Sequence, residues 1–423
     1  IEPKTRRVGS RFTDWTESSV SLARRVFGLG DPLLFGVIIL MSGLGIAMIY
    51  SAGQVEVRSV ATGIWVRQLT WLGVAGIAFV VISRMSLRFL EWLAPWVYGV
   101  SLALLLLVLG IGTGPSGSWI ELGPGRLQPV EIAKLGTILM LARIMSGKPQ
   151  DFAGLSQLWK PVAIVALPFA LVLLQPDLGS AIIFGVILIA ALFWSGVPLI
   201  KIFLLGSPAI SLLLGFNWIV WGGWFLIVAM CLYFHRPFIV ESLGVILANF
   251  SGGVLTVPLW NTLADYQKNR LLVFLDPEVD PQGSGWHLIQ SKVAIGSGGL
   301  FGQGFAAGPQ KRLAFLPEQH TDFIFSVVGE ELGLLGVLVF FALFGLLLFR
   351  VLRIALDSAD DFGSTIVFCL FAVMFAHVTL NLGMTVGLLP IAGLPLPLIS
   401  YGGSFLLLTY AGFGMIQRVA SER

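Results

Sequence analysis

The sequence predicts an all-α polytopic membrane protein. Of its 423 residues, 56% are hydrophobic and only 12% are charged, and the mean hydropathy is +0.90, far more apolar than a soluble domain of this length. Apolar runs recur along the chain, such as "LLFGVIILMSGLGIAMIY" from Leu33 and "SAIIFGVILIAALFWSGV" from Ser180. Each approaches the ~20 residues that a helix needs to cross ~30 Å of hydrocarbon, whereas the strands of a transmembrane barrel would be shorter and would alternate.

Twelve apolar windows, bounded by charged residues or by proline and glycine, predict the spans in chain order. They are 33–52, 64–83, 91–112, 129–146, 161–175, 179–197, 202–216, 218–234, 239–259, 323–349, 363–382 and 398–416. Arginine and lysine residues precede the first span and recur in every second loop. The positive-inside rule therefore places both termini in the cytoplasm, with 1–31 as a cytoplasmic segment and 32–423 as one integral-membrane domain.

The opposite, outer face carries a loop of about sixty residues, 265–322, which is too long to lack structure of its own. Within it, "GWHLIQSKVAIGSGG" places Trp286, Ile289, Val293 and Ala294 on one helical face and points Gln290 and Ser291 away from that face. This pattern predicts a helix lying on the outer membrane surface. The glycine-rich stretch 296–308 that follows is expected to make few intrachain contacts.

Four carboxylates lie at or just inside the start of the span 323–349: Glu318, Asp322, Glu330 and Glu331. Charge in or near hydrocarbon is costly and points to function. Asp322 is expected at the outer interface, at the first residues of the span. Spacing alone leaves two interpretations open, because Thr321 or Asp322 could cap the helix, or Asp322 could take part in a reaction.

A second polar group lies in "RLQPVEIAK", where Glu131 and Lys134 share a helical face and Arg126 lies in the loop above them. The two charges form either a structural i,i+3 ion pair or part of an anion site. Further cations fall on the same outer face: Arg67, Arg270, Lys292, Lys311 and Arg312. A substrate that bears phosphates on that side would explain them.

The remaining polar residues have structural interpretations. Asp177 in "QPDLGS" follows a proline at an outer turn, where a helix N-cap is expected. His377 and Asn381, four apart in one span, predict an interhelical hydrogen-bond pair. Two prolines and three glycines in "IAGLPLPLISYGGS", 391–404, predict a broken helix beside a cavity or protein. The sequence has no pattern typical of a metal cage, a nucleotide-binding loop or a nucleophile elbow.

Five stretches together resemble the SEDS family, the shape, elongation, division and sporulation proteins of bacteria. They are "GSWIELGPGRLQPVEIAK", "QPDLGS", "DYQKNRLLVFLDPEVDPQGSGWHLIQSKVAIGSGGLFGQG", "FLPEQHTDFIFSVVGEELG" and "PLPLISYGGS". The resemblance runs from about Arg67 to the C-terminus and is closest to the elongation branch. The chain departs from the family pattern at Ser118, Val130 and Phe405, and it has room for three spans in 202–259 where the family has one. We therefore expect about ten family spans and an extra pair of helices.

The resemblance implies a peptidoglycan glycosyltransferase of cell elongation. Such proteins polymerise lipid II, an undecaprenyl-pyrophosphate-linked disaccharide, on the outer face of the cytoplasmic membrane. It makes Asp322 the catalytic residue, which we interpret as the general base of an inverting transfer. Together, the resemblance and the basic residues of the outer face assign substrate binding to Arg67, Trp119, Arg126, Glu131, Lys134, Asp177, Lys292 and Ser400. No cofactor is certain, although a divalent cation such as Mg²⁺ could share the countercharge for the pyrophosphate.

The expected partners follow from the same resemblance. They are lipid II, a class B penicillin-binding protein that crosslinks the strands, other proteins of the elongation complex and membrane lipids, with no nucleic acid. The partner's ectodomain is expected to order the outer loop, and its single helix to dock on lipid-facing spans near the C-terminus. A transporter that flips lipid II is the alternative, because many spans, broken helices and intramembrane charges suit it as well.

Overall fold

The computed structural model describes residues 29–55, 63–114, 117–122, 125–147, 154–235, 238–280, 283–313, 315 and 318–422. Nearly all of the expected cytoplasmic segment 1–31 lies outside these residues. The described part is almost entirely helical, apart from one short antiparallel hairpin of β1 (Ile120–Leu122) and β2 (Gly125–Leu127).

A helix occupies each of the twelve predicted windows. These helices are α2 (Pro32–Ala52), α3 (Ile64–Ser83), α4 (Leu87–Ile111), α5 (Pro129–Met145), α6 (Trp159–Leu174), α7 (Leu178–Trp194), α8 (Leu199–Leu214), α9 (Trp218–His235), α10 (Ile239–Thr262), α14 (Ile324–Asp357), α15 (Asp361–Val386) and α16 (Gly403–Ser421). Eight helices of the described chain are long and apolar enough to cross a membrane, one of them including the 3₁₀ turn Leu155–Leu158 before α6.

The other four, α5, α7, α8 and α16, fall short of that measure by length or composition. In α5 and α16 most residues are buried against other helices, so these two face protein more than lipid and need a less apolar composition. Hydropathy alone therefore locates them less well than the lipid-facing helices.

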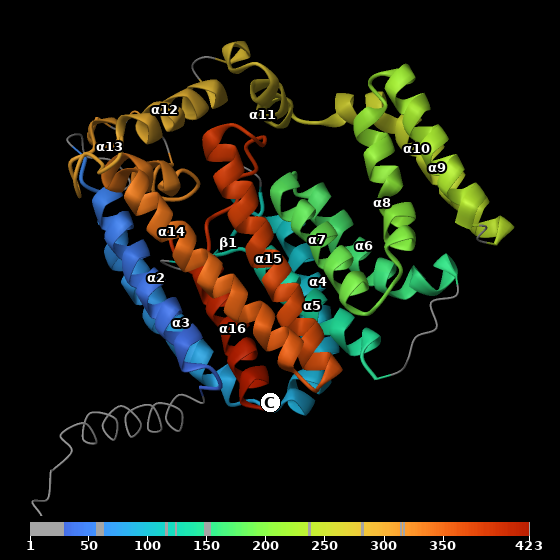
Figure 1. Cartoon of the computed structure of the whole chain (residues 1–423), viewed down its shortest axis with the longest axis horizontal. Coiled ribbons are helices and arrows are strands. Elements are labelled where there is room, and N and C mark those ends of the chain that lie inside the picture. The colour runs from blue at the N-terminus through green and yellow to red at the C-terminus, as the bar shows by residue number, and fades with distance from the viewer. Residues whose placement is uncertain are drawn as a thin grey trace, which may run out of the picture.

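The helices form one main bundle and a three-helix group at its side (Figure 1). In the bundle α3 packs against α16, α4 against α5, and α14 against both α2 and α15. The side group consists of α8, α9 and α10, which pack on one another and reach the bundle through α7 and α8. The three helices predicted for 202–259 are thus present and peripheral, while the assignment of two of them as additional to the family pattern stays a prediction.

A buried asparagine joins the side group internally. Asn249 on α10 donates its amide to Ser207 Oγ at 2.7 Å and to Val245 O at 2.9 Å, and it accepts a 2.7 Å hydrogen bond from Ser211. Its side chain therefore links α10 to α8 without reaching the main bundle.

The two described ends of the chain meet at one end of the bundle (Figure 1). The Asp31 backbone exchanges hydrogen bonds of 2.8 Å with the side chain of Gln417 on α16, and the Asp31 carboxylate pairs with Arg350 on α14. An even number of crossings between these ends agrees with the predicted topology. The predicted sidedness itself rests on the positive charges, and Arg236 of that argument lies outside the described residues.

The opposite end of the bundle carries the long loop, which contains α11 (Asp265–Leu275), a 3₁₀ turn (Pro277–Val279), α12 (Ser284–Ser297) and α13 (Pro309–Arg312). The predicted surface helix is present as α12, with Trp286, Ile289 and Val293 exposed. As predicted, Ser291 points away from that face, since its hydroxyl is buried toward the protein, at 2.7 Å from Ser326 Oγ and 2.6 Å from Thr385 O. The placement of Ala294 on the exposed face was wrong, because Ala294 is buried where α12 packs its small residues on α14 and α15.

The expectation of few contacts for the stretch 296–308 was also wrong. α14 is interrupted at Gly333, which has φ of 62° and ψ of −165°, a conformation that favours glycine. Four backbone hydrogen bonds join the loop to this break: Gln303 N to Glu330 O at 2.9 Å, Gly304 N to Glu331 O at 3.1 Å, Leu334 N to Gly299 O at 2.9 Å and Leu335 N to Leu300 O at 3.1 Å. The groups that a helix break frees are satisfied by the loop, so the loop is fixed to the bundle.

Candidate active site

The acidic stretch before α14 does not cap that helix. The N-cap position is Phe323, and no side chain accepts a hydrogen bond there. The Thr321 hydroxyl instead donates to Glu318, at 3.2 Å from its backbone oxygen and 3.0 Å from Oε2. The capping interpretation of Thr321 or Asp322 is therefore wrong, and the role of Asp322 needs another explanation.

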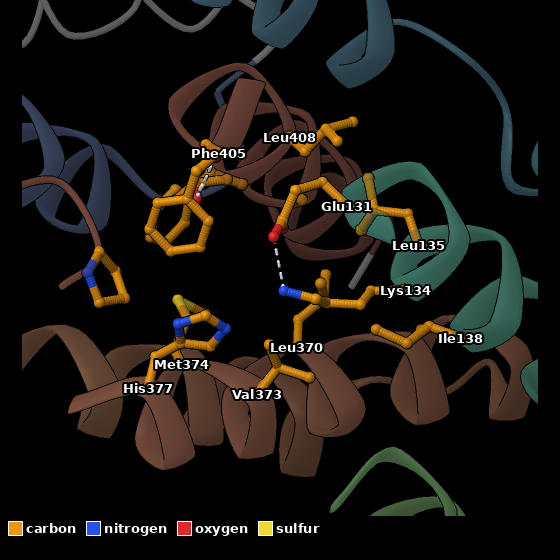
Figure 2. A pocket seen from close by; sticks show the side chains of 14 residues that line it. Glu131, Lys134, Leu135, Ile138, Leu370, Val373, Met374, His377, Phe405 and Leu408 are labelled. Atoms are coloured by element: carbon orange, nitrogen blue, oxygen red, sulfur yellow. Dashed lines mark hydrogen bonds and ion pairs between the residues drawn. The ribbon is translucent and has the colours of Figure 1, made fainter. Parts of the chain in front are cut away.

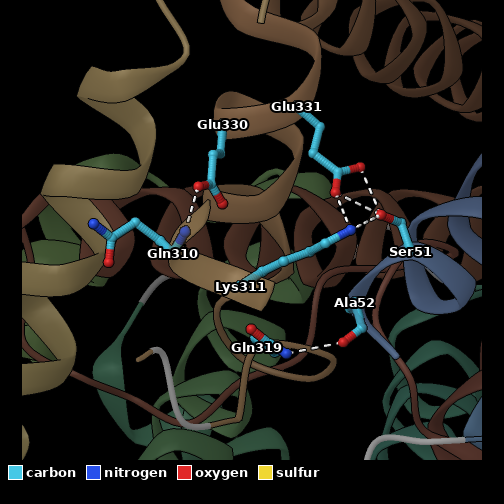
Figure 3. A network of polar contacts seen from close by, with 7 residues as sticks. All are labelled: Ser51, Ala52, Gln310, Lys311, Gln319, Glu330 and Glu331. Carbon is cyan, nitrogen blue, oxygen red and sulfur yellow. Dashed lines mark hydrogen bonds and ion pairs between the residues drawn. The ribbon is translucent and has the colours of Figure 1, made fainter. Parts of the chain in front are cut away.

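Two of the four carboxylates stabilise the loop deep in the protein (Figure 3). Lys311 from α13 pairs with Glu331 on α14, and both contact the hydroxyl of Ser51 at the end of α2. Glu330, also fully buried, accepts a 2.7 Å hydrogen bond from the backbone N–H of Gln310. Because Glu318 bonds to Thr321, Asp322 is the only one of the four whose carboxylate has no hydrogen bond or ion pair with another described residue.

The surroundings of Asp322 favour its protonated form more than water would. Burial raises the pKa of the half-buried Asp322 carboxyl from 3.8 to about 6, the negative charge of Glu318 adds to this, and the positive charge of Arg270 opposes it. A carboxyl with such a pKa is mostly ionised at pH 7 but can still accept a proton readily. Raised carboxyl pKa values of this kind are typical of reactive sites.

Arg270 and Asp322 converge on Gly393 in the broken segment between α15 and α16. A Cβ atom added at Gly393 would lie 3.3 Å from Arg270 Nη1 and 3.6 Å from Asp322 Oδ2. The residue has φ of 67°, which favours glycine. In the broken segment predicted from "IAGLPLPLISYGGS", the backbone at Gly393 therefore lies next to both the Asp322 carboxylate and the Arg270 guanidinium.

α11 carries Arg270 to this place, and the turn before α7 holds α11. Pro176 O accepts hydrogen bonds from Tyr266 Oη at 2.9 Å and from Gln267 Nε2 at 3.2 Å. Asp177 caps α7 by accepting the Ser180 N–H at 2.9 Å, as the sequence predicted. Asp177 therefore stands beside the helix that supports Arg270.

Glu131 and Lys134 form a buried ion pair of 2.7 Å, and each residue is less than a tenth exposed. Figure 2 shows the pair facing His377 of α15 and Phe405 of α16 across a cavity of about 50 Å³. This volume holds a few water molecules but no sugar. The predicted i,i+3 ion pair is present, and its contact with substrate stays a prediction.

The predicted hydrogen-bond pair His377 and Asn381 bonds to the broken segment. His377 Nδ1 lies 3.1 Å from Pro395 O, and Asn381 Nδ2 donates to Leu394 O at 2.8 Å. Asn381 also donates to the backbone oxygen of Asp322 at 2.9 Å. Both side chains thus fix segments near the acid.

The other predicted substrate-binding residues differ from Asp322 in exposure and in their contacts. Arg67 and Lys292 are exposed, and Arg126 forms an exposed 3.4 Å cross-strand pair with Glu121. Trp119 is half-buried in the loop that leads to β1. Ser400 is 2% exposed, and its hydroxyl donates a hydrogen bond to Thr321 O at 2.6 Å. Ser400 therefore holds the backbone next to Asp322.

Sequence reasoning missed three residues next to Asp322. Arg270 was noted only as one cation of the outer face, Glu318 only as one of four acids, and Asn381 as part of a pair with His377. Their roles depend on the fold of the outer loop, which no local periodicity reveals. The described residues contain no group of three or more His, Cys, Asp and Glu side chains placed to hold a metal ion.

Comparisons with known proteins match nearly the whole chain. A family model for the FtsW, RodA and SpoVE proteins, described as "Cell cycle protein", matches residues 31–423. Peptidoglycan glycosyltransferase MrdB of Escherichia coli K12 is 35% identical over 397 residues, covering 93% of this chain and 94% of MrdB. Peptidoglycan glycosyltransferase RodA of Treponema pallidum is 31% identical over 427 residues, covering 93% of this chain and 98% of that protein.

Two solved structures have a similar fold. A chain from a peptidoglycan synthase complex that coordinates polymerization and crosslinking is 32% identical, with a TM-score of 0.68, over 93% of this chain and 98% of its own length. The rod shape determining protein RodA of Thermus thermophilus is 27% identical, with a TM-score of 0.61, over 93% of this chain and 97% of its own length.

Proposed function

This chain belongs to the FtsW, RodA and SpoVE family of cell cycle proteins, and on that premise we propose that it is a peptidoglycan glycosyltransferase with Asp322 as its general base. MrdB and RodA, two relatives that match over 93% of the chain, are named for that activity. The apolar helices make it a multi-pass protein of the cytoplasmic membrane. Its role is in rod-shape elongation, which fits the names of these relatives.

The catalytic assignment rests on which of the four acids at the outer end of α14 have a hydrogen-bond or ion-pair partner. Three of them are held by hydrogen bonds or an ion pair, and Asp322 alone is left with a carboxylate that no described residue binds. A half-buried carboxylate with a pKa of about 6 is suited to accept a proton at neutral pH. Structural acids are usually satisfied by partners instead.

The proposed reaction joins two lipid-linked disaccharides. The 4-hydroxyl oxygen of the acceptor sugar forms a bond to the anomeric carbon of the donor while its proton passes to the Asp322 carboxylate. The bond from that carbon to the pyrophosphate oxygen breaks, and the lipid pyrophosphate leaves with the electron pair. Attack from the face opposite the leaving group inverts the configuration at the carbon.

The leaving pyrophosphate needs countercharge more than a general acid. Arg270 is the cation that acts on Asp322, and we propose that it also faces the pyrophosphate. The exposed Arg67, Arg126 and Lys292 remain proposed contacts for the lipid II head group. Lys134 is buried and paired with Glu131, so we assign it a smaller share of the countercharge for the pyrophosphate than the sequence suggested.

A divalent cation such as Mg²⁺ stays a proposal. Since no three metal-binding side chains come together among the described residues, the oxygens of the substrate pyrophosphate would hold most of such an ion. Its contribution would be to share the charge of the leaving group.

We propose a class B penicillin-binding protein as the partner. Support comes from the related chain in a synthase complex that couples polymerization and crosslinking. The described chain has an apolar groove of about 960 Å³ between α12, α14 and α15, lined by several glycines and by Phe341 and Phe375. Glycines let a helix approach closely in a membrane. This groove, on two of the last three spans in the sequence, is therefore our proposed site for the partner's single helix.

Lipid II in liposomes tests the function. Protein in the membrane should lengthen glycan strands from lipid II, faster when the partner is present. Transfer of lipid II between leaflets without any polymer would favour the alternative, a flippase.

A further inference from the structure

The backbone of the catalytic stretch is held from one side by three consecutive hydrogen bonds. Each of the last three carbonyl oxygens before Phe323 accepts from the region between α15 and α16 or from α15 itself. The pairs are Tyr401 N to His320 O at 2.9 Å, Ser400 Oγ to Thr321 O at 2.6 Å and Asn381 Nδ2 to Asp322 O at 2.9 Å. Among the described residues, Asn381 alone binds the backbone oxygen of Asp322 itself.

Asn381 uses both hydrogens of its amide nitrogen. Besides Asp322 O, Nδ2 donates to Leu394 O at 2.8 Å, and the residue is fully buried. Two carbonyl oxygens around one amide nitrogen fix which end of the side chain points there, because the reversed amide would place oxygen against oxygen. The side chain therefore has a single satisfactory orientation.

The other end of the same amide is left without a partner. Asn381 Oδ1 is buried and accepts no hydrogen bond from the described residues. An unsatisfied buried acceptor destabilises a protein, so its presence in a helix needs a reason. In a membrane helix a leucine of similar size would pack without that penalty. The reason lies at the nitrogen, which joins two segments that must stay together.

Those two segments carry the elements of the proposed site. Leu394 follows Gly393, against which the Arg270 guanidinium and the Asp322 carboxylate both lie. Asn381 binds Asp322 O and Leu394 O at once. It therefore holds the segment 320–322, which bears the acid, against the segment at Gly393 and Leu394, beside which Asp322 and Arg270 both lie. Its contacts thus fix where the carboxylate stands relative to Arg270.

We propose that Asn381 is a positioning residue for catalysis, which sets the place of the Asp322 carboxylate beside Arg270 through the Asp322 and Leu394 backbone. The proposal rests on the proposed function of Asp322. Asn381 touches no reacting atom, so its loss should act on the rate of the chemical step and leave lipid II binding largely intact.

The test compares Asn381→Leu with Asn249→Leu. Asn249 is a matched control, because it is equally buried, sits in α10 and also donates two hydrogen bonds from its amide, away from the site. We expect both variants to unfold at a lower temperature, because each loses two buried hydrogen bonds of the amide nitrogen, which outweighs the gain from removing the amide oxygen. Only Asn381→Leu should lower kcat for lipid II polymerisation, by about 10- to 100-fold with KM within about twofold, and shift the midpoint of its pH–rate profile.

A conservative variant separates positioning from folding. Asn381→Gln keeps an amide nitrogen, and we expect it to retain more kcat than Asn381→Leu. Wild-type kcat and pH profile in Asn381→Leu would overturn the proposal, as would equal kcat losses in the two leucine variants. Asp322→Asn in the same assay distinguishes a failure of the positioning role of Asn381 from a failure of the proposed catalytic role of Asp322. If it is inactive while Asn381→Leu is normal, only this inference fails, and if Asp322→Asn is active, the proposed role of Asp322 fails.

Discussion

The pH dependence of polymerisation is set by the surroundings of Asp322. With a pKa of about 6, about half of the carboxyl is ionised at pH 6, about 90% at pH 7 and about 9% at pH 5. We therefore expect kcat/KM to fall about tenfold between pH 7 and pH 5, because kcat/KM reports the pKa of the enzyme without substrate. An aspartate with an ordinary pKa of 3.8 would stay about 94% ionised at pH 5 and change the rate little.

Two substitutions should move this profile in opposite directions. Glu318→Gln removes a negative charge that raises the pKa of Asp322, so the profile should shift to lower pH. Arg270→Gln removes a positive charge that lowers this pKa, so the profile should shift to higher pH. Initial rates at lipid II concentrations well below KM, between pH 5 and 8, measure the shifts, with Glu422→Gln at the other end of the protein as the control. A wild-type rate that is flat from pH 5 to 7, or equal shifts in both variants, would refute the reasoning.

Three further predictions concern the remaining charges. Lys311→Met leaves Glu331 buried and unpaired and should destabilise the protein by about 3 to 5 kcal/mol in thermal unfolding, whereas adding Glu331→Gln should restore most of it; equal stability of the two variants would contradict this. The double change Glu131→Gln and Lys134→Met should keep KM for lipid II near wild type, because both side chains are buried and bind each other. A large rise in KM would show that these residues bind substrate. EDTA should slow polymerisation, and Mg²⁺, Mn²⁺ and Ca²⁺ should restore it similarly, because the described residues form no selective metal site; restoration by Mg²⁺ alone would argue for one.

The spans could be predicted because hydrocarbon imposes a simple requirement on every residue that faces it. The predicted 64–83 coincides with α3 and 33–52 differs from α2 by one residue. α14 shows the limit of this reasoning. It was predicted as a single span, yet the helix is interrupted at Gly333, two residues after Glu331, where backbone from the distant loop replaces the missing hydrogen bonds. Hydropathy averaged over a span does not show which distant backbone will pair with it.

In the candidate site, too, some features could be predicted from the sequence and others could not. The position of Asp322 near the outer end of a helix follows from the sequence, because α14 begins two residues later. The partners of the neighbouring acids do not follow, since Lys311 and Ser51 reach Glu331 from 20 and 280 residues away. Arg270 comes from a loop helix whose place depends on a hydrogen bond to Pro176 O. Contacts of this kind are set by tertiary packing and have no local pattern.

Asp322→Asn is the most direct test of the general base. The amide keeps the size of the side chain but cannot accept the proton, so we expect the polymerisation rate to fall by about 100- to 10,000-fold. The melting temperature should not fall, because Asp322 caps no helix and its raised pKa means that the fold disfavours the charged form. Polymerisation of lipid II by purified Asp322→Asn, at matched protein and partner concentrations, is the measurement. A rate near that of the wild type would contradict the central claim.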